Sequence, residues 1–314
     1  MRRRTILGVL ALPGAASAQA RQLHIVNPFP PGSPVDLVAR LAGDKLEAAF
    51  GQPVVVESRS GAGGTIGAGF VARAAADGST LLCTTASLLT AALIQRDLPY
   101  QPLRDLVPIW GVQAGGLAVV VNPGVPARTL AEFTALARAQ PGRFSFASSG
   151  HGSVQHFGGA LYQARAGVQL THVPYRGGAP AATDLIAGHV DAMFDAFSNQ
   201  WANIQAGRVR VLALLRDRRL GLAPDIPTAA EAGLPGAVMP SWIGLFAPAA
   251  TAAAALERIE HVLRQAMAQP DAADKLLRAG QEPDFIAGAA FRQRIVEDAG
   301  IFARIAREAG IGPE

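Results

Sequence analysis

The stretch Leu23–Asp36, with the sequence LHIVNPFPPGSPVD, decides the fold class of this chain. It opens with a short apolar run and continues into a segment rich in proline and glycine, which ends the strand. A helix is predicted over Val35–Phe50, because Leu37, Val38 and Leu41 recur near the 3.6-residue helical spacing. A short apolar strand that turns directly into a helix is the repeating unit of an α/β fold.

The same alternation of short apolar runs and helical patterns continues along the chain. Most of the runs are continuous rather than alternating in polarity, which is typical of parallel strands covered on both faces. Strands are predicted at Leu23–Val26, Val54–Glu57, Thr80–Thr84, Leu117–Val121, Phe144–Ala147, Thr171–Val173, Ala192–Phe194, Val209–Leu215 and Trp242–Ala247. The expected fold is therefore α/β with mainly parallel sheets.

Further helices are predicted between these strands and at the C-terminal end. Thr129–Ala139 begins with a capping box, in which Thr129 stands three residues before Glu132. Helices are also predicted at Val154–Ala164 and over residues 252–279 and 288–309.

Two punctuated stretches suggest where the chain crosses between domains. They are Asn122–Pro126, which follows a predicted strand, and Gly233–Gly236, which precedes the last one. We expect residues 21–122 plus 238–314 to form one lobe and residues 123–237 to form an inserted second lobe. Two crossings make a hinge, and the cleft between the lobes is suited to closing on a small solute.

Residues 1–20 have the pattern of an export signal. Arg2, Arg3 and Arg4 precede a short apolar stretch, and small residues follow up to Ala20, so cleavage is expected near Ala18 to Ala20. The apolar stretch is shorter than the roughly 20 residues that a membrane span needs. Secretory and twin-arginine export both remain open.

The charge balance excludes nucleic acid as an expected partner. The chain carries 28 basic and 24 acidic residues, and removal of the leader leaves 25 against 24. The mature chain therefore lacks the basic excess of a nucleic-acid-binding protein.

Motifs for catalysis, metals and cofactors are missing from the sequence. There is no G-x-S-x-G elbow and no H-E-x-x-H spacing. Gly61–Gly67 departs from the dinucleotide-binding pattern, because Ile66 stands in place of the third glycine. His151 and His156 are interpreted as loop or cap residues rather than catalytic or metal-binding ones. Cys83 lies in an apolar run and is interpreted as a small buried residue. We expect no catalytic residue, metal or cofactor.

Two loops that lead into helices are candidates for binding an anion, because N–H groups and the helix dipole favour negative charge there. The first follows the first strand and supplies Phe29, Pro30, Gly32 and Ser33. It can equally be a rigid turn without a ligand. The second follows the strand at Phe144–Ala147, and its hydroxyls and amide can donate to a carboxylate. It supplies Ser148, Ser149, Gly150, Ser153 and Gln155. Asp195 is a candidate for contacting an amino or hydroxyl group at the far end of a ligand.

In these segments the chain resembles the receptor family of tripartite tricarboxylate transporters, also called Bug proteins. The resemblance covers essentially the whole mature chain in order. It is carried by Val26–Gly32 with Asp36, Gly51–Glu57, Arg59–Gly67, Asp77–Gly78, Leu98–Tyr100, Phe146–Ser153 with His156, His172–Gly177, Asp184–Leu185, Phe194–Asp195, Pro227–Thr228, Glu231–Gly233 and Pro248–Ala249. Ser33, Ser58, Ser60 and Ala196–Ser198 depart from the family pattern, which bears on ligand identity.

The resemblance implies a two-lobed periplasmic binding protein fold of type II and a receptor without enzymatic activity. It implies that a small carboxylate-bearing solute, such as a di- or tricarboxylate, an acidic amino acid or an aromatic acid, is bound for uptake. Two integral-membrane transporter subunits are the implied partners, and a monomer in the periplasm is expected. A signalling receptor that passes the same ligand to a sensor protein remains an alternative. A hydrolase that uses Ser148, Ser149 or Ser153 with a histidine is the rival class.

Overall fold

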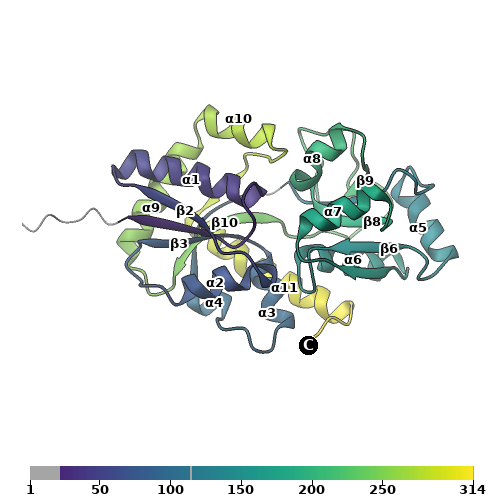
Figure 1. Cartoon of the computed structure of the whole chain (residues 1–314), viewed down its shortest axis with the longest axis horizontal. Coiled ribbons are helices and arrows are strands. Elements are labelled where there is room, and N and C mark those ends of the chain that lie inside the picture. Colours follow the sequence, from purple (N-terminus) through teal and green to yellow (C-terminus); the bar gives the residue numbers. More distant parts are fainter. Residues whose placement is uncertain (1–21, 114, 314) are drawn as a thin grey trace, which may run out of the picture.

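The computed structural model describes residues 22–113 and 115–313 and shows two α/β lobes side by side (Figure 1). The predicted export signal lies outside the described residues. Within the described ranges, no helix combines the length and the apolar character needed to cross a membrane.

The first lobe is built on a six-stranded sheet with the order β11-β4-β10-β3-β1-β2. Its strands are β1 (Leu23–Asn27), β2 (Val54–Ser58), β3 (Thr80–Thr85), β4 (Leu106–Gln113), β10 (Trp242–Pro248) and β11 (Phe285–Ala287). Helices α1 (Pro34–Phe50), α9 (Ala253–Met267) and α10 (Pro270–Arg278) pack on one face. The other face carries α2 (Thr65–Ala72), α3 (Ser87–Ile94) and α11 (Gly288–Glu308). The short elements η1 (Ala62–Gly64) and α4 (Pro102–Asp105) lie in connections.

The second lobe is built on a five-stranded sheet with the order β7-β6-β8-β5-β9. Its strands are β5 (Leu117–Val121), β6 (Ser145–Ser148), β7 (Thr171–Pro174), β8 (Ala192–Ala196) and β9 (Arg210–Leu214). Helices α5 (Leu130–Ala139) and α6 (Val154–Ala166) pack on one face. Helices α7 (Gly178–Ala187) and α8 (Phe197–Gln205) pack on the other. The predicted capping box is present, because Thr129 and Glu132 exchange hydrogen bonds at the start of α5.

Both sheets are mixed rather than mainly parallel. In the first lobe, β1 is parallel to β2 and β3, but β10 is antiparallel to β3 and β4. In the second lobe, β6 is parallel to β7 and β8, whereas β5 is antiparallel to β8 and β9. A continuous apolar run indicates only that a strand is buried on both faces, so it does not reveal the direction of its neighbours.

The first crossing between the sheets comes earlier than expected. Residues up to 122 were expected in the first lobe. However, β5 hydrogen-bonds with β8 and β9, so this strand belongs to the sheet of the second lobe. The Asn122–Pro126 stretch is a turn at the far end of β5, where Val125 N–H donates to the Asn122 carbonyl. Proline and glycine mark both turns and domain crossings, and the sequence alone did not separate the two.

Two strands were not predicted, and one predicted helix is divided. Pro108 and Gly111 interrupt the apolar pattern of β4. The ladder with β10 changes register beside Pro108, and such an irregularity is where a strand tolerates proline. The short strand β11 pairs with the same part of β4. The helix expected over residues 252–279 is split into α9 and α10, because Pro270 starts a new helix.

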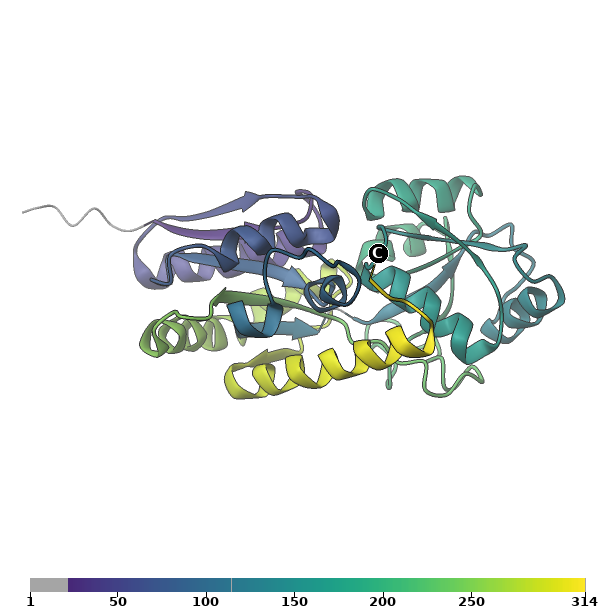
Figure 2. The same cartoon turned by 90° about the horizontal axis from the view of Figure 1, so that it is seen from below.

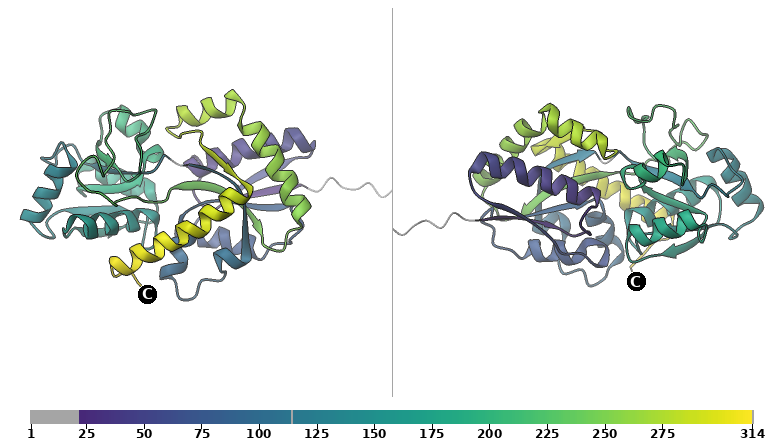
Figure 3. Two further views of the ribbon diagram at one scale, coloured as in Figure 1. Left: turned by 180° about the vertical axis from the view of Figure 1, so that it is seen from behind. Right: turned by 45° about the horizontal axis from the view of Figure 1, so that its top comes forward.

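Helix α11 connects the two lobes. It starts beside the first sheet and extends along the second lobe, as Figure 2 and the left view of Figure 3 show. Phe291 packs against Trp242 and Phe246 of the first sheet. Farther along the helix, Phe302 packs edge-on against Phe157 of α6, with ring centroids 5.9 Å apart. The lobes are therefore joined by packed apolar side chains as well as by the two chain crossings.

Candidate functional site

A cavity of about 970 Å³ lies between the lobes and is lined by residues of both. Many of its lining residues stand at the N-terminal ends of helices. They include Ser33–Val35 at α1, Val154 and Gln155 at α6, Gly177–Ala179 at α7 and Ser198–Gln200 at α8. Each helix presents its positive dipole end and its first N–H groups, so the cavity favours an anion. Phe29, Leu117 and Trp242 provide apolar walls.

The loop between β1 and α1 is a tight turn held by its own hydrogen bonds. The Ser33 hydroxyl accepts from the Asp36 N–H at 3.2 Å and caps α1. The Asp36 carboxylate accepts from the Gly32 N–H at 3.0 Å. Phe29, Pro30, Gly32 and Ser33 all line the cavity. The Gly32 N–H, however, is used within the loop and is not directed at a ligand.

Asp36 ties this turn to the strand and the helix. Its buried carboxylate also accepts from the Asn27 amide at 3.3 Å and from Arg40 Nε at 2.9 Å. Burial opposes ionisation, but the hydrogen bonds from Arg40 and Gly32 outweigh it, and the pKa of Asp36 lies below its ordinary value.

The loop between β6 and α6 contains the same turn. The Ser153 hydroxyl accepts from the His156 N–H at 3.2 Å and donates to the Gly150 carbonyl at 2.7 Å. The Ser148 hydroxyl is hydrogen-bonded to Gly150 and to His172. Both serines are buried, and neither lines the cavity. Contrary to the expectation, the structure does not place these hydroxyls at the cavity wall, because the helix cap, the loop backbone and His172 already engage them.

The remaining predicted residues of this loop do reach the cavity. Ser149, Gly150 and Gln155 line it. The Gln155 amide nitrogen donates to Asp195 at 3.1 Å, and its oxygen accepts from the Ser149 hydroxyl at 2.9 Å. The second hydrogen of the amide group is available to an acceptor in the cavity.

Asp195 lines the cavity but is only 1% exposed. Its carboxylate accepts from Gln155, from Asn199 at 2.8 Å, from Gln200 at 2.7 Å and from the Ala196 N–H at 2.8 Å. Burial raises its pKa, and these donors act in the opposite direction. Four donors use most of the acceptor capacity of a carboxylate, so little is left for an amino group of a ligand. Asp195 instead orients the three amides around the cavity.

The Ser148–His172 pair is the arrangement closest to a hydrolase. The Ser148 Oγ lies 2.7 Å from His172 Nε2. Burial, followed by the neighbouring His156 and His151, lowers the pKa of His172 to about 3. Ser148 is fully buried and does not line the cavity, so a substrate bound there has no access to its oxygen. The geometry does not favour the hydrolase class.

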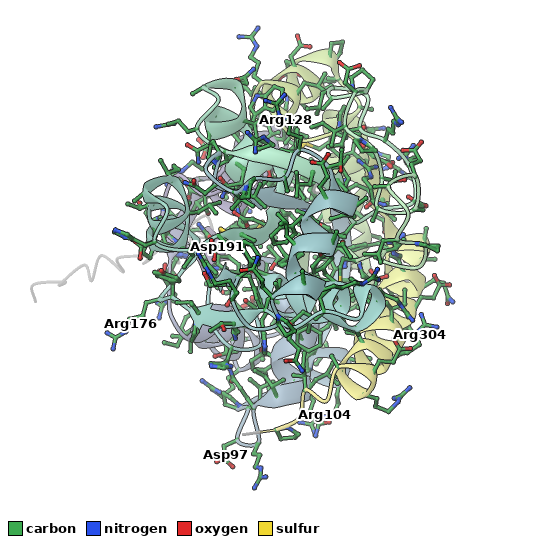
Figure 4. The ribbon with its side chains drawn as sticks, turned by 90° about the vertical axis from the view of Figure 1, so that its right-hand side faces the viewer. Asp97, Arg104, Arg128, Arg176, Asp191 and Arg304 are labelled. Carbon is green, nitrogen blue, oxygen red and sulfur yellow. The ribbon has the colours of Figure 1, made fainter. Side chains whose placement is uncertain are left out.

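Among the described residues that line the cavity, Arg176 is the one Lys or Arg. Its side chain is exposed and points away from the body of the molecule (Figure 4). The positive character of the interior therefore comes from helix ends and amides rather than from cationic side chains.

Several lining residues were not proposed from the sequence as ligand contacts. They are the Ser60–Gly64 segment, Thr85–Ser87, His151, Arg176–Ala179, Ser198–Gln200, Ser241–Ile243 and Gln281. The Gly61–Gly67 motif departs from the dinucleotide-binding pattern, but its Gly61–Gly64 part lies at the cavity wall. Strand-to-helix loops with small residues were the available signal for Thr85–Ser87 and for Ser198–Gln200. The sequence gives no comparable signal for Gln281, which reaches the cavity from the loop between α10 and β11.

Two α/β lobes with an anion-favouring cavity between them define a two-lobed periplasmic binding protein, and solved structures of that class agree. R. palustris Rpa4515 with adipate has a TM-score of 0.89 and 30% identity, covering 95% of this chain and 100% of that one. MatC from Rhodopseudomonas palustris with bound malate has a TM-score of 0.81 and 30% identity, covering 91% and 99%. The periplasmic binding protein BugD has a TM-score of 0.83 and 29% identity, covering 94% and 99%.

The family model for the tripartite tricarboxylate transporter family receptor matches residues 38–310, and the chain belongs to this family. An uncharacterised-family protein from the tcbD-tcbE intergenic region of Pseudomonas sp. strain P51 is 40% identical over 89% of this chain and 86% of its own length. Protein BugT of Bordetella pertussis is 33% identical over 96% and 94%. The resemblance inferred from the sequence motifs is confirmed.

Proposed function

We propose that this chain is a periplasmic receptor that closes on a small dicarboxylate and presents it for uptake, without changing it chemically. The observation that carries the proposal is the convergence of the α1, α6, α7 and α8 N-termini on one cavity. Each such terminus favours an anion by about 0.3–1 kcal/mol, and more when it is partly buried. The oriented amides of Gln155 and Asn199 add donors at the same place.

The ligands of similar proteins support a dicarboxylate within the broader class of carboxylates. Two of the structural neighbours hold adipate and malate, which are both dicarboxylates. The cavity volume is large enough for ligands of either size. The ligands of these neighbours therefore support a dicarboxylate more than an aromatic acid. Asp195 is already engaged by four donors, which argues against an acidic amino acid whose ammonium group would need that carboxylate.

Transport partners follow from the family rather than from the cavity. Receptors of this family are named for tripartite transporters, so we propose two integral-membrane subunits as partners. A signalling receptor would bind the same ligand in the same cavity, and purification with the partner protein would separate the two roles.

Thermal unfolding of residues 21–314 against a panel of carboxylates tests the proposal. A ligand at 100 times its Kd adds about 2.7 kcal/mol of stability. At roughly 2–4 °C per kcal/mol for a protein of this size, we expect Tm to rise by several degrees. Adipate and malate should raise Tm, and the uncharged adipamide should not. Equal shifts with adipate and adipamide, or no shift with any acid, would contradict an anion site.

The variant Gln155→Leu tests the cavity assignment. It removes an amide that faces the cavity, and a hydrogen bond to a charged group contributes about 1.5–3 kcal/mol. We expect the affinity for the best carboxylate to fall by about 10- to 100-fold in calorimetric titration. Gln205→Leu is the matched control, since Gln205 is an exposed residue at the end of α8 that does not line the cavity. Its affinity should stay within about twofold of the parent.

A further inference from the structure

Three histidines form a compact cluster at the edge of the cavity. His151 lies in the β6–α6 loop, His156 in the first turn of α6 and His172 in β7. One ligand-capable atom from each residue lies within 4.8 Å of the other two. His151 is exposed and lines the cavity, whereas the other two are half-buried. We propose that these residues hold one divalent transition-metal ion of the zinc class at the cavity wall.

The fold places the three rings together from two directions. β6 and β7 pair in parallel, with Phe146 opposite His172, and the two rings stack with centroids 4.7 Å apart. The turn that begins α6 stacks the His156 ring on the His172 ring, with centroids 4.2 Å apart and planes within 5° of parallel. His151 stands edge-on to both, at 5.3 and 5.0 Å. Gly150 and Gly152 have φ of +122° and +71°, which lets the loop turn His151 back over the pair.

The neighbours of His172 suit a metal ligand. The Gly150 N–H donates to the Ser148 hydroxyl, and that hydroxyl lies within hydrogen-bond reach of the Gly150 carbonyl. When the Ser148 hydroxyl donates its hydrogen to that carbonyl, it can only accept from His172. His172 then carries its hydrogen on Nε2 and donates it to Ser148, which leaves the lone pair on Nδ1. A metal-bound histidine usually donates its other N–H in this way, which fixes the ring. At His156, metal binding replaces a long 3.3 Å contact from the Gly152 N–H.

The donor set selects the kind of metal. Three imidazoles without a carboxylate in the cluster suit Zn²⁺, Co²⁺, Ni²⁺ or Cu²⁺ rather than Mg²⁺ or Ca²⁺. Tetrahedral zinc with bonds of 2.0–2.1 Å needs nitrogens about 3.4 Å apart. Ring nitrogens donate in the plane of the ring, so two nearly parallel rings cannot both point at one ion, and one must turn about its Cβ–Cγ bond, a torsion with broad minima. Three protein ligands leave the fourth position for water or a ligand atom.

The fourth position would face the cavity, because His151 lines it. If the proposed function holds, a carboxylate oxygen of the bound solute can complete the coordination, and metal and carboxylate then bind with positive coupling. Metal binding itself does not depend on the proposed function.

Metal titration of a tag-free protein, stripped with chelator and dialysed, tests the site. We expect Zn²⁺ to bind with one-to-one stoichiometry in calorimetry, and Co²⁺ to give the visible bands of a four-coordinate site. Loss of an outer-shell partner already costs 10- to 100-fold in metal affinity, so His151→Ala should weaken binding by at least about 100-fold. His151 is exposed, so this variant should fold normally, which circular dichroism will confirm. His261→Ala, which removes an exposed histidine of α9, is the matched control and should bind as the parent does.

Each outcome decides one of the two proposals. Absence of Zn²⁺ binding, or equal binding by His151→Ala and the parent, overturns the metal site. A Tm shift with adipate in the presence of chelator supports the carboxylate receptor whether or not metal binds. If the parent binds Zn²⁺ and His151→Ala does not, the metal site is supported. If, in addition, no carboxylate raises Tm, the proposed function is contradicted.

Discussion

The β1–α1 loop and the β6–α6 loop are the same turn built in two lobes. In each, a serine caps the helix by accepting the N–H three residues on, from Asp36 to Ser33 and from His156 to Ser153, both at 3.2 Å. The residue before each serine is a glycine, whose N–H donates back to the side chain of that third residue. The turns differ in what that side chain is: a buried carboxylate in the first lobe and an imidazole in the second.

That difference changes how each turn is held in place. Asp36 accepts hydrogen bonds from three neighbours at 2.9–3.3 Å, and so joins the loop to β1 and α1. At the corresponding place, His156 accepts a longer 3.3 Å bond from the Gly152 N–H, and its ring packs against His151, Phe157 and His172. We infer that a carboxylate holds the first loop by hydrogen bonds, whereas the second loop is held in part by packed imidazole rings.

Removal of the Asp36 carboxylate should have the largest effect on stability. Asp36→Ala leaves the Gly32 N–H and the buried Asn27 amide without their partner, and each orphaned group costs about 1–3 kcal/mol. We expect the free energy of unfolding in urea to fall by about 2–4 kcal/mol. Arg40→Ala is the control, because it removes only the pair with the exposed Arg40 guanidinium and keeps the other donors of the turn, so it should cost less, about 0.5–1 kcal/mol. Equal losses in the two variants would show that the ion pair, and not the turn, stabilises the loop.

The next largest effect should be a difference between the two loops in how their contribution to stability depends on pH. Burial lowers the pKa of His172 in the folded protein to about 3, below its ordinary value of 6.5, so the unfolded chain binds more protons between these values. Stability is therefore full above about pH 6.5 and falls as the pH is lowered toward 3. Asp36 has a lowered pKa, so its contribution is present above its unfolded value of 3.8 and is lost only below it. At about pH 5, only the second loop should respond.

Urea unfolding in chelator near pH 7.5 and near pH 5 measures this response. With allowance for the partial exposure of His172, we expect it to account for a loss of about 1 kcal/mol at the lower pH. His172→Gln cannot titrate, so the variant should lose correspondingly less than the parent between the two values. The same pH dependence in both proteins would show that other histidines cause the loss.

The sequence predicted the parts of the molecule that depend on local patterns. Apolar runs located nine of the strands, and the Thr129 capping box located the start of α5. β4 was missed because Pro108 is accommodated by an irregularity in pairing with a strand far away in the chain. The direction of β5 and the place of the first crossing depend on partners that the run Leu117–Val121 does not specify.

The candidate site shows the same limit. The two loops were located correctly, because strand-to-helix turns with small residues are local features. Which hydroxyls face the cavity was not predictable, since Ser149 and Ser153 look alike in sequence and only Ser153 caps a helix. Asp195 was expected to meet a ligand, and its engagement by Asn199 and Gln200 depends on the start of α8.

The smallest effect expected is the difference between the two serine caps. Ser33→Ala and Ser153→Ala each remove the same helix-capping bond, which typically contributes about 1 kcal/mol. If the turns are equivalent, their losses in urea unfolding should agree within about 0.5 kcal/mol. Ser153 also donates to the Gly150 carbonyl. Among the hydrogen bonds of the described residues, Ser33 has no corresponding bond. A loss at Ser153 that exceeds the loss at Ser33 by more than 1 kcal/mol would mean that this bond, rather than the cap, holds the second loop.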